Sequence, residues 1–262
     1  MADGYGARGF HPDPEWLRFR ELRKKLESME GWAFRAAMAN LARSQRICVA
    51  NWAMFDSVAG RFKRDSEFAL SVWGGSMQNE ERWATFLEAL DVALHNFVAS
   101  AFAVLEHTRT VADTHLRGEA HEVRLEKYRE TFEKPSLPAF VRGLRHYLLH
   151  YAPSYARGTL DLSMEDLGEG FTMAHRIVLD LAEMKSWRRW KLKARAYIDE
   201  CGATVDLHEV MSAFNDILAE YQNWFVAFAF ESNREKLDEF NAVALEHDAI
   251  IEKVRRVLLE NQ

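Results

Sequence analysis

Apolar side chains recur every three or four residues along most of the chain, a spacing typical of amphipathic α-helices. The longest such signal covers residues 79–116, where Leu90, Leu94 and Phe97 begin one apolar stripe. With few prolines and glycines to interrupt it, the pattern predicts a mainly α-helical bundle. Further helices are expected over residues 15–29, 32–55, 120–131, 136–151, 182–200, 206–232 and 235–260, with a short one ending near Trp73.

Residues 154–180 break this pattern. Gly158, Gly168 and Gly170 interrupt the segment, and RIVLDL at 176–181 has the β-branched, alternating character of a strand. A small β-hairpin insertion is therefore expected around 154–180, so the predicted fold class is a mainly α helical bundle with one hairpin.

A Gly-Gly-Ser sequence at 74–76 is the clearest break in the first half of the chain. It predicts a boundary between an N-terminal helical segment, residues 15–75, and a helical bundle formed by residues 76–262. Residues 1–14 are expected to be a flexible N-terminus.

Composition narrows the function classes. Of the 262 residues, 48% are hydrophobic and 28% are charged, as in an ordinary globular protein. The net charge of −6 gives no overall attraction to nucleic acid, so such a partner would need a local basic patch. Two isolated cysteines, Cys48 and Cys201, fit a reducing compartment and exclude a cysteine-based zinc cluster. Without a signal peptide or a long uncharged apolar run, we expect a cytoplasmic protein with no membrane segment.

The P-loop, hydrolase and zinc-protease motifs GxxxxGK[ST], GxSxG and HExxH are absent. The informative segment is 136–160, which has no Asp or Glu although the chain contains 40 acidic residues. Such a local positive field suits phosphate, and the alternative is a chance gap combined with a basic helix end. Its basic residues are Arg142, Arg145, His146, His150 and Arg157.

Helical geometry groups some of these side chains and separates others. Arg142, His146 and His150 follow one another at intervals of four residues and share one face of the expected helix. Arg145 lies about 140° around the helix from His150, since each residue advances about 100°. Bringing Arg145 and His150 together would require the full length of the arginine or a distorted last turn before Pro153.

The sequence RHYLLH, Arg145–His150, resembles the motif of the HEPN (higher eukaryotes and prokaryotes nucleotide-binding) superfamily. That motif is an arginine, a polar residue, three further residues and a histidine. HNF at His95–Phe97 and EHTR at Glu106–Arg109 are also similar to uncharacterised bacterial members. The resemblance covers residues 80–230. In the second motif position, His146 replaces the more usual Asn or Asp and would titrate.

This resemblance implies a homodimer whose two motifs face one cleft, and a metal-independent endoribonuclease without cofactors. In such enzymes the 2′-hydroxyl attacks the adjacent phosphate, so the substrate would be RNA, expected to be single-stranded. His150 would be the general acid or base, Arg145 would hold the scissile phosphate, and His146 would orient one of them or contact phosphate.

Further substrate-binding candidates lie on the motif helix, on the long helix and in the basic segment 185–195. The polar groups on the long helix can equally be surface or core residues. Segment 185–195 can clamp RNA bases, or it can expose its charges while Trp187 and Trp190 are buried. No metal is expected at His146 and His150, because no carboxylate is nearby in sequence. The candidates are Arg142, Asn96, His107, Arg109, Lys185, Arg188 and Arg189.

A catalytically silent helical interaction or scaffold protein, in which Arg145 and His150 are structural, is the alternative. An antitoxin-like partner of another protein is a third hypothesis. The position of the two side chains separates the first two: a solvent-reachable groove favours the enzyme, and a buried His150 favours the scaffold. The apolar run at 224–230 is expected to be bundle core or dimer interface.

Overall fold

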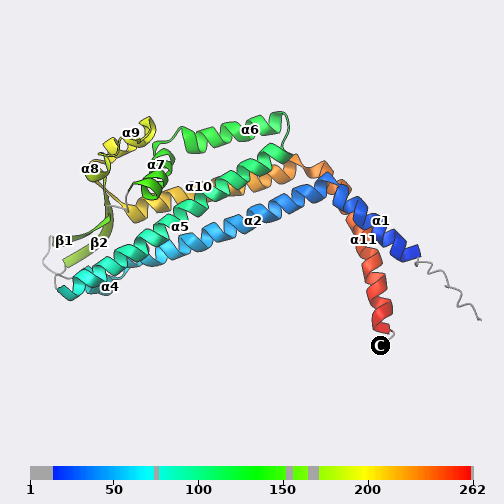
Figure 1. Cartoon of the computed structure of the whole chain (residues 1–262), viewed down its shortest axis with the longest axis horizontal. Helices are drawn as coiled ribbons and strands as arrows, with labels where there is room; N and C mark the ends of the chain where they lie inside the picture. The colour runs from blue at the N-terminus through cyan, green and yellow to red at the C-terminus, as the bar shows by residue number, and fades with distance from the viewer. Residues whose placement is uncertain (1–13, 74–76, 152–155, 165–170, 261–262) are drawn as a thin grey trace, which may run out of the picture. The chain divides into compact units, whose positions relative to one another are not determined.

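The computed structural model describes residues 14–73, 77–151, 156–164 and 171–260, and most of them are helical (Figure 1). A mainly α fold with a small hairpin is thus confirmed. The helices are α1 (Pro14–Ser28), α2 (Glu30–Phe55), α3 (Arg61–Arg64), α4 (Ser66–Trp73), α5 (Met77–His115), α6 (Glu119–Tyr128), α7 (Ser136–His150), α8 (Leu181–Met184), α9 (Leu192–Cys201), α10 (Leu207–Ser232) and α11 (Arg234–Glu260), with single π-helical turns η1 (Asp56–Gly60) and η2 (Arg129–Glu133).

The chain divides into two compact units. Unit 1 comprises residues 1–40 and 230–262, and unit 2 comprises residues 41–229. Residue 75, where the sequence suggested a boundary, falls inside unit 2, because α4 and α5 on its two sides pack together. Residues 1–13, expected to be flexible, and the Gly-Gly-Ser break at 74–76 lie outside the described residues.

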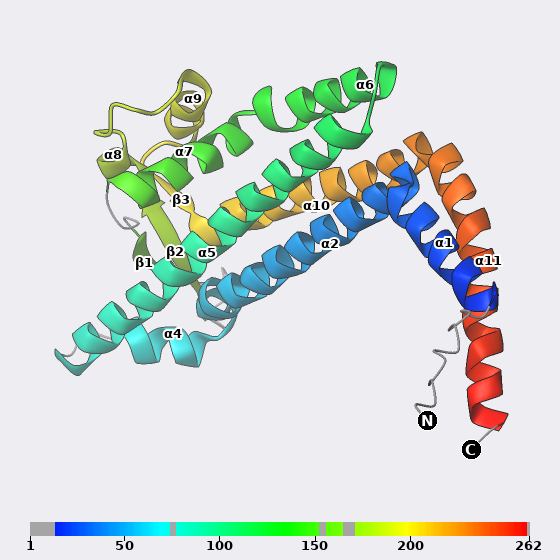
Figure 2. The ribbon, with the colours of Figure 1, turned by 45° about the vertical axis from the view of Figure 1, so that its right-hand side comes forward.

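Unit 1 is built on two antiparallel helices, α1 and α11, and the first turns of α2 (Figure 2). The rings of Phe19 and His247 stack with their centroids 4.7 Å apart. A Cβ at Gly31 would lie 2.6 Å from the Cβ of Phe240, so only glycine lets α11 come this close to the start of α2. The buried apolar side chains of this unit are Leu22, Leu26, Phe34, Met38 and Phe240.

Unit 2 is organised around α5. Its predicted stripe is confirmed: Leu90, Leu94 and Phe97 are fully buried. Residues Glu80–His115 are long and apolar enough to cross a membrane, yet half of their most apolar window is buried inside the structure. A buried core helix has the same composition, so the expectation of no membrane segment stays a prediction.

The hairpin expected from the sequence is present, and it carries a third strand that the sequence did not predict. β1 (Ala156–Met164) pairs antiparallel with β2 (Phe171–Asp180), and β2 pairs antiparallel with β3 (Thr204–Asp206). Three residues are too few for an alternating pattern to be recognised. The carboxylates of Asp180 and Asp206 then cap α8 and α10 by accepting the backbone N–H of Glu183 and Glu209.

The single helix predicted over 182–200 is wrong, because the chain leaves the helical path between α8 and α9. The indole N–H of Trp190 donates to the carbonyl of Met184 at 2.8 Å, which folds the connection back on itself. Trp187 and Trp190 are consequently 8% and 6% exposed. This inward turn brings α9 against α7, as both ribbon views show (Figures 1 and 2).

Candidate functional site

Helix α7 carries the motif predicted from the sequence. It begins at Ser136, after the extended residue Pro135, and Pro138 lies in its first turn, where a missing N–H costs nothing. One side of the helix is anchored in the core of unit 2, which leaves the polar side available. The buried residues of α7 are Pro138, Phe140, Val141, Leu144 and Tyr147.

A cavity of about 500 Å³ lies between the polar side of α7 and the segment that leads into α9. We call it the α7–α9 cavity. Two imidazoles and four fixed cations line it, against one carboxylate, Glu133, among the lining residues described. The basic lining residues are Arg142, His146, His150, Arg189, Lys191 and Lys193.

Aromatic packing fixes the shape of this cavity. The indole of Trp190 stacks on Phe140 and Tyr147 of α7, with centroid separations of 5.6 and 5.9 Å. A Cβ on Gly143 would lie 2.5 Å from Cζ3 of Trp190, so the glycine permits this close approach. Trp187 therefore lines the cavity, and Trp190 packs on α7 beside it. Both tryptophans are buried, as the hypothesis of buried tryptophans predicted, and are not free to stack on RNA bases.

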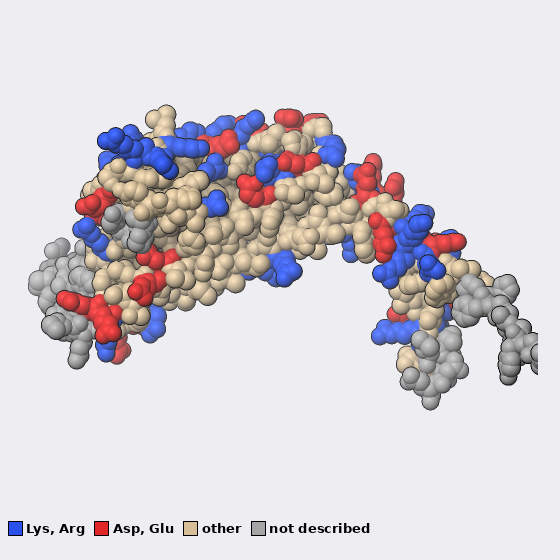
Figure 3. Space-filling view, in the orientation of Figure 1, with Lys and Arg blue, Asp and Glu red and all other residues tan. Residues whose placement is uncertain are grey.

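Positive charge in the cavity is poorly neutralised. Within the described part of the chain, Arg189 and Lys191 have no carboxylate at ion-pair distance. Lys193 donates to the backbone carbonyls of Glu133 and Lys134, which carry no net charge. Figure 3 shows the lysine and arginine side chains gathered over the region of α9. An anion bound here would meet several cations and few competitors.

The two imidazoles lie next to each other on α7, both exposed. Their ring centroids are 6.1 Å apart, with an angle of 27° between the planes. Burial and the neighbouring charges of Arg145 and His150 lower the pKa of His146 below its usual value. His146 is therefore biased towards the neutral form, which can accept a proton.

Arg145 does not line the cavity. Its guanidinium carbon lies 5.5 Å from the ring centroid of Phe102 on α5, and its Nε is buried without a hydrogen-bond partner. The last turn of α7 remains helical through His150, so no distortion brings the two motif residues together. The helix thus brings His146 and His150 together and directs Arg145 to another side.

Of the substrate-binding candidates, Arg142 and Arg189 line the cavity, and five others do not. His107 is hydrogen-bonded to Ser44 on α2. Arg109 pairs with Glu106 at 2.8 Å, and Lys185 pairs with a carboxylate of α9 at 2.6 Å. The five outside the cavity are Asn96, His107, Arg109, Lys185 and Arg188.

Lys191 and Lys193 are lining residues that the sequence-based candidates omitted. Both belong to the basic segment 185–195, whose composition was the available signal. Which of its cations face α7 depends on the turn at Trp190, and local periodicity does not report that turn.

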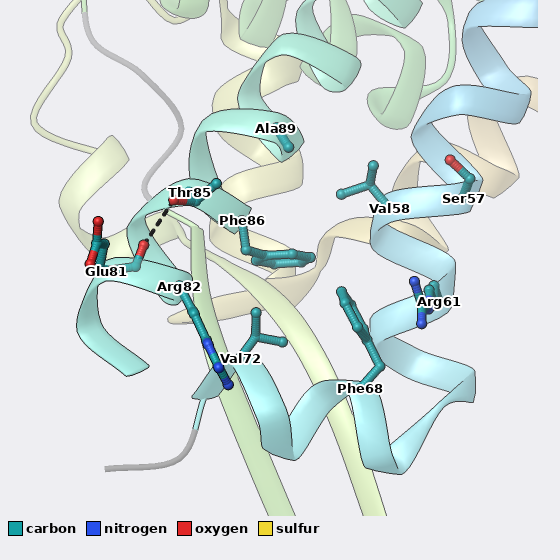
Figure 4. A pocket seen from close by; sticks show the side chains of 10 residues that line it. All are labelled: Ser57, Val58, Arg61, Phe68, Val72, Glu81, Arg82, Thr85, Phe86 and Ala89. Carbon is teal, nitrogen blue, oxygen red and sulfur yellow. Dashed lines mark hydrogen bonds between the residues drawn. The ribbon is translucent and has the colours of Figure 1, made fainter. Parts of the chain in front are cut away.

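A second cavity of about 680 Å³ lies between η1, α3, α4 and α5 (Figure 4). We call it the α4–α5 cavity. Its two arginines are largely engaged: Arg61 pairs with Asp65 at 3.3 Å and stacks over Phe68, and Arg82 donates to a backbone carbonyl. Glu81 adds negative charge to the lining, and no imidazole is among the lining residues described. The α7–α9 cavity is therefore the better candidate site.

No three His, Cys, Asp or Glu side chains gather as a metal-binding group within the described residues. The chain matches no protein-family model, and neither the curated proteins nor the solved structures contain a match to it. The resemblance to the HEPN superfamily therefore stays a prediction, carried by the motif residues alone.

Proposed function

We propose that the α7–α9 cavity binds the phosphate backbone of single-stranded RNA and cleaves it without a metal ion. One observation carries the proposal: two imidazoles and four cations surround a cavity to which the described lining contributes one carboxylate. Imidazoles titrate near neutral pH and transfer protons, while arginine forks match the oxygens of phosphate.

The arginines that line the cavity bind the phosphate. Arg142 and Arg189 come from the two sides of the cavity, one from α7 and one from the segment before α9. A phosphate between them would receive charge-assisted hydrogen bonds from both guanidinium groups. Those bonds also stabilise the extra negative charge that develops on the phosphate oxygens during cleavage.

The two histidines transfer the protons. The 2′-hydroxyl oxygen attacks the adjacent phosphorus and passes its proton to the neutral imidazole of His146. The bond from phosphorus to the 5′ oxygen breaks, and that oxygen takes a proton from the imidazolium of His150. The products are a 2′,3′-cyclic phosphate and a 5′-hydroxyl end, which makes the reaction specific to RNA.

Arg145 acts through His146 in this scheme and is a positioning residue. Its positive charge is one cause of the lowered pKa of His146, after burial. Keeping this imidazole neutral at pH 7 preserves it as a base. Substitution of Arg145 should therefore move the pH profile of cleavage, a readout that a purely structural role would leave in place.

A homodimer belongs to the same proposal. The apolar run at 224–230 is partly core, since Phe225 and Ala229 are buried, but Trp224 and Phe228 are only half-buried and stack on each other at 5.0 Å. This half-exposed pair on α10 supports a contact with a second chain. Sedimentation equilibrium of wild type and a Phe228→Glu variant measures whether such a dimer exists.

The direct test is cleavage of a labelled single-stranded RNA in excess EDTA. Wild type should yield cyclic-phosphate ends, and His146→Gln and His150→Gln should each reduce the rate by about 10²–10⁴-fold. His95→Gln is the matched control, because His95 is exposed on α5 outside the cavity and should retain the rate.

A substrate with a 2′-deoxy nucleotide at every position should remain intact. If RNA binds to wild type but is not cut, the result supports RNA binding and excludes the proposed cleavage. Neither binding nor cleavage would favour the scaffold alternative, in which the packing of Arg145 against Phe102 is structural.

A further inference from the structure

Three arginines gather around the rings of Phe102 and Tyr128, beside the α7–α9 cavity that one of them, Arg142, also lines. The guanidinium carbon of Arg124 on α6 lies 5.2 Å from the ring centroid of Tyr128. Those of Arg142 and Arg145 lie 6.0 and 5.5 Å from the ring centroid of Phe102. Arg142 also donates to the hydroxyl of Tyr128 at 2.8 Å. These five residues and Tyr221 form what we call the arginine–tyrosine cluster.

The cluster has no negative partner among the described residues. Arg124 is 2% exposed, and neither it, Arg142 nor Arg145 has a carboxylate at ion-pair distance there. The Nε atoms of Arg124 and Arg145 are buried and make no hydrogen bond. A guanidinium removed from water without a counter-charge is strongly unfavourable, and the faces of aromatic rings compensate only part of that cost.

Tyr221 cannot supply the missing charge near neutral pH. Burial raises the pKa of Tyr221 to about 12, and the adjacent charge of Arg124 opposes that rise without cancelling it. Tyr221 therefore remains a neutral hydroxyl in the cell's pH range. Its hydroxyl oxygen is buried and interacts with the guanidinium of Arg124 without a well-aligned hydrogen bond, and the Nε atoms of Arg124 and Arg145 are buried without any.

Access to the cluster is by way of α7. Arg142 and Arg145 are half-buried, whereas Arg124 is enclosed. On the helix, Arg142 lies between the direction of His146 and that of Arg145, since each residue advances about 100°. Arg142 is thus shared by the cavity and the cluster, and it is the first cation that an anion moving from one to the other would meet.

We propose that the arginine–tyrosine cluster is a second anion site, which binds a phosphate group either free in solution or in an RNA backbone. A tetrahedral oxyanion can accept several N–H donors at once, which matches forked guanidinium groups better than a monovalent halide does. Phosphate binding here does not require the proposed cleavage, because the cluster uses Arg124 and no imidazole, although it shares Arg142 with the α7–α9 cavity.

The experiment compares thermal unfolding of the full-length chain in sodium phosphate and in sodium chloride at equal ionic strength and pH. Phosphate should raise the melting temperature of wild type in a saturable way, because it binds only the folded state. Arg124→Met should lose the part of this phosphate-dependent rise that the cluster contributes, while melting no lower than wild type in chloride, since it removes an unpaired buried charge. Arg129→Met, an exposed residue paired with Glu126, is the matched control and should keep the full rise.

If Arg124→Met does not fold, Arg145→Met provides the same comparison at a half-buried position. An equal phosphate response in wild type and in the folded cluster variant, or no response in wild type, would overturn the proposal.

Fluorescence anisotropy with a single-stranded RNA in EDTA then distinguishes the two sources of phosphate. A tenfold loss of RNA affinity in the cluster variant assigns the phosphate to the RNA backbone. Unchanged RNA affinity together with a lost phosphate response assigns it to a free phosphate or a small phosphate ester. Neither readout depends on cleavage, so failure of the proposed ribonuclease activity leaves this test intact.

Discussion

The α4–α5 and α7–α9 cavities, both in unit 2, differ more in charge than in size. The α4–α5 cavity is the larger, about 680 Å³ against about 500 Å³, and it also contains two arginines. Its arginines bond to Asp65 and to a backbone carbonyl, and Glu81 also lines it. By contrast, Arg189 and Lys191 of the α7–α9 cavity have no carboxylate at ion-pair distance among the described residues. Uncompensated charge next to titratable imidazoles, and not volume, therefore identifies the candidate site.

The largest effect is expected from Gly143→Ala, which alters the α7–α9 cavity alone. The new methyl group would meet the buried ring of Trp190 at 2.5 Å, and overpacking of this kind costs about 1–3 kcal/mol. Alanine regains about 0.5–1 kcal/mol of helix propensity, so the net effect is destabilising. Chemical denaturation measures it. Leu149→Ala, on the exposed side of α7, should cost less, and equal effects would show that Trp190 does not press on Gly143.

The second-largest effect is expected from charge reversal at one lining residue, which should weaken RNA binding. Arg189→Glu places a carboxylate in the α7–α9 cavity, and we expect about a tenfold loss of affinity, which is about 1.4 kcal/mol. Its neighbour Arg188 is exposed but does not line the cavity, so Arg188→Glu is a matched control with a smaller loss. Fluorescence anisotropy at fixed salt compares the two. Equal losses would mean that only overall charge matters.

Near the α4–α5 cavity, charged side chains pair with one another and stabilise the fold. Arg64 is the main cause that lowers the pKa of Asp56 to about 2, with His208 adding to it. Because the folded pKa is depressed, this contribution is complete above the usual aspartate range and is lost as the pH falls towards 2. The carboxylate is one-third exposed, so we expect Asp56→Asn to cost only about 1 kcal/mol at pH 7. Urea unfolding at pH 7 and pH 2.5 checks this, and an equal cost at both would refute it.

The smallest effect is expected in the pH dependence of RNA affinity, through the protonation of His146. Its pKa is lowered, so it gains a proton at a lower pH than an ordinary histidine, and RNA affinity should then rise a few-fold as positive charge is added. The unfolded chain takes up that proton first, so the stability of the free protein should fall slightly over the same range. Titration of RNA affinity between pH 7.5 and 5 should show a weaker rise in His146→Gln. An unchanged rise would assign it to other groups.

Much of the fold could be predicted because helical periodicity is a local property. The stripe on α5 and the ends of α7 follow from the spacing of apolar residues and from Pro135 and Pro153. The break between α8 and α9 could not, because it depends on the indole of Trp190 finding the carbonyl of Met184 and a space beside Gly143. Those contacts join residues of different elements, so the local sequence pattern does not predict them.

The part of the candidate site that lies on α7 could be predicted from the sequence, and the part contributed by other elements could not. The acid-free run at 136–160 and the spacing of Arg142, His146 and His150 correctly grouped the cations on one face of α7. The contribution of Lys191 and Lys193 required the turn before α9. The position of Arg145 over Phe102 required the packing of α7 on α5, which no local pattern encodes.

In our proposal, unneutralised charge is the property that lets the α7–α9 cavity bind RNA. The most direct test of this proposal is the salt dependence of single-stranded RNA affinity in two double variants, Arg142→Met/Arg189→Met and Arg61→Met/Arg82→Met. Each phosphate contact contributes about 0.7 to the slope of log affinity against log salt, so the first variant should flatten the slope by about 1.4. The second variant should leave the slope unchanged. Equal changes in both variants, or a change in the second alone, would contradict the account.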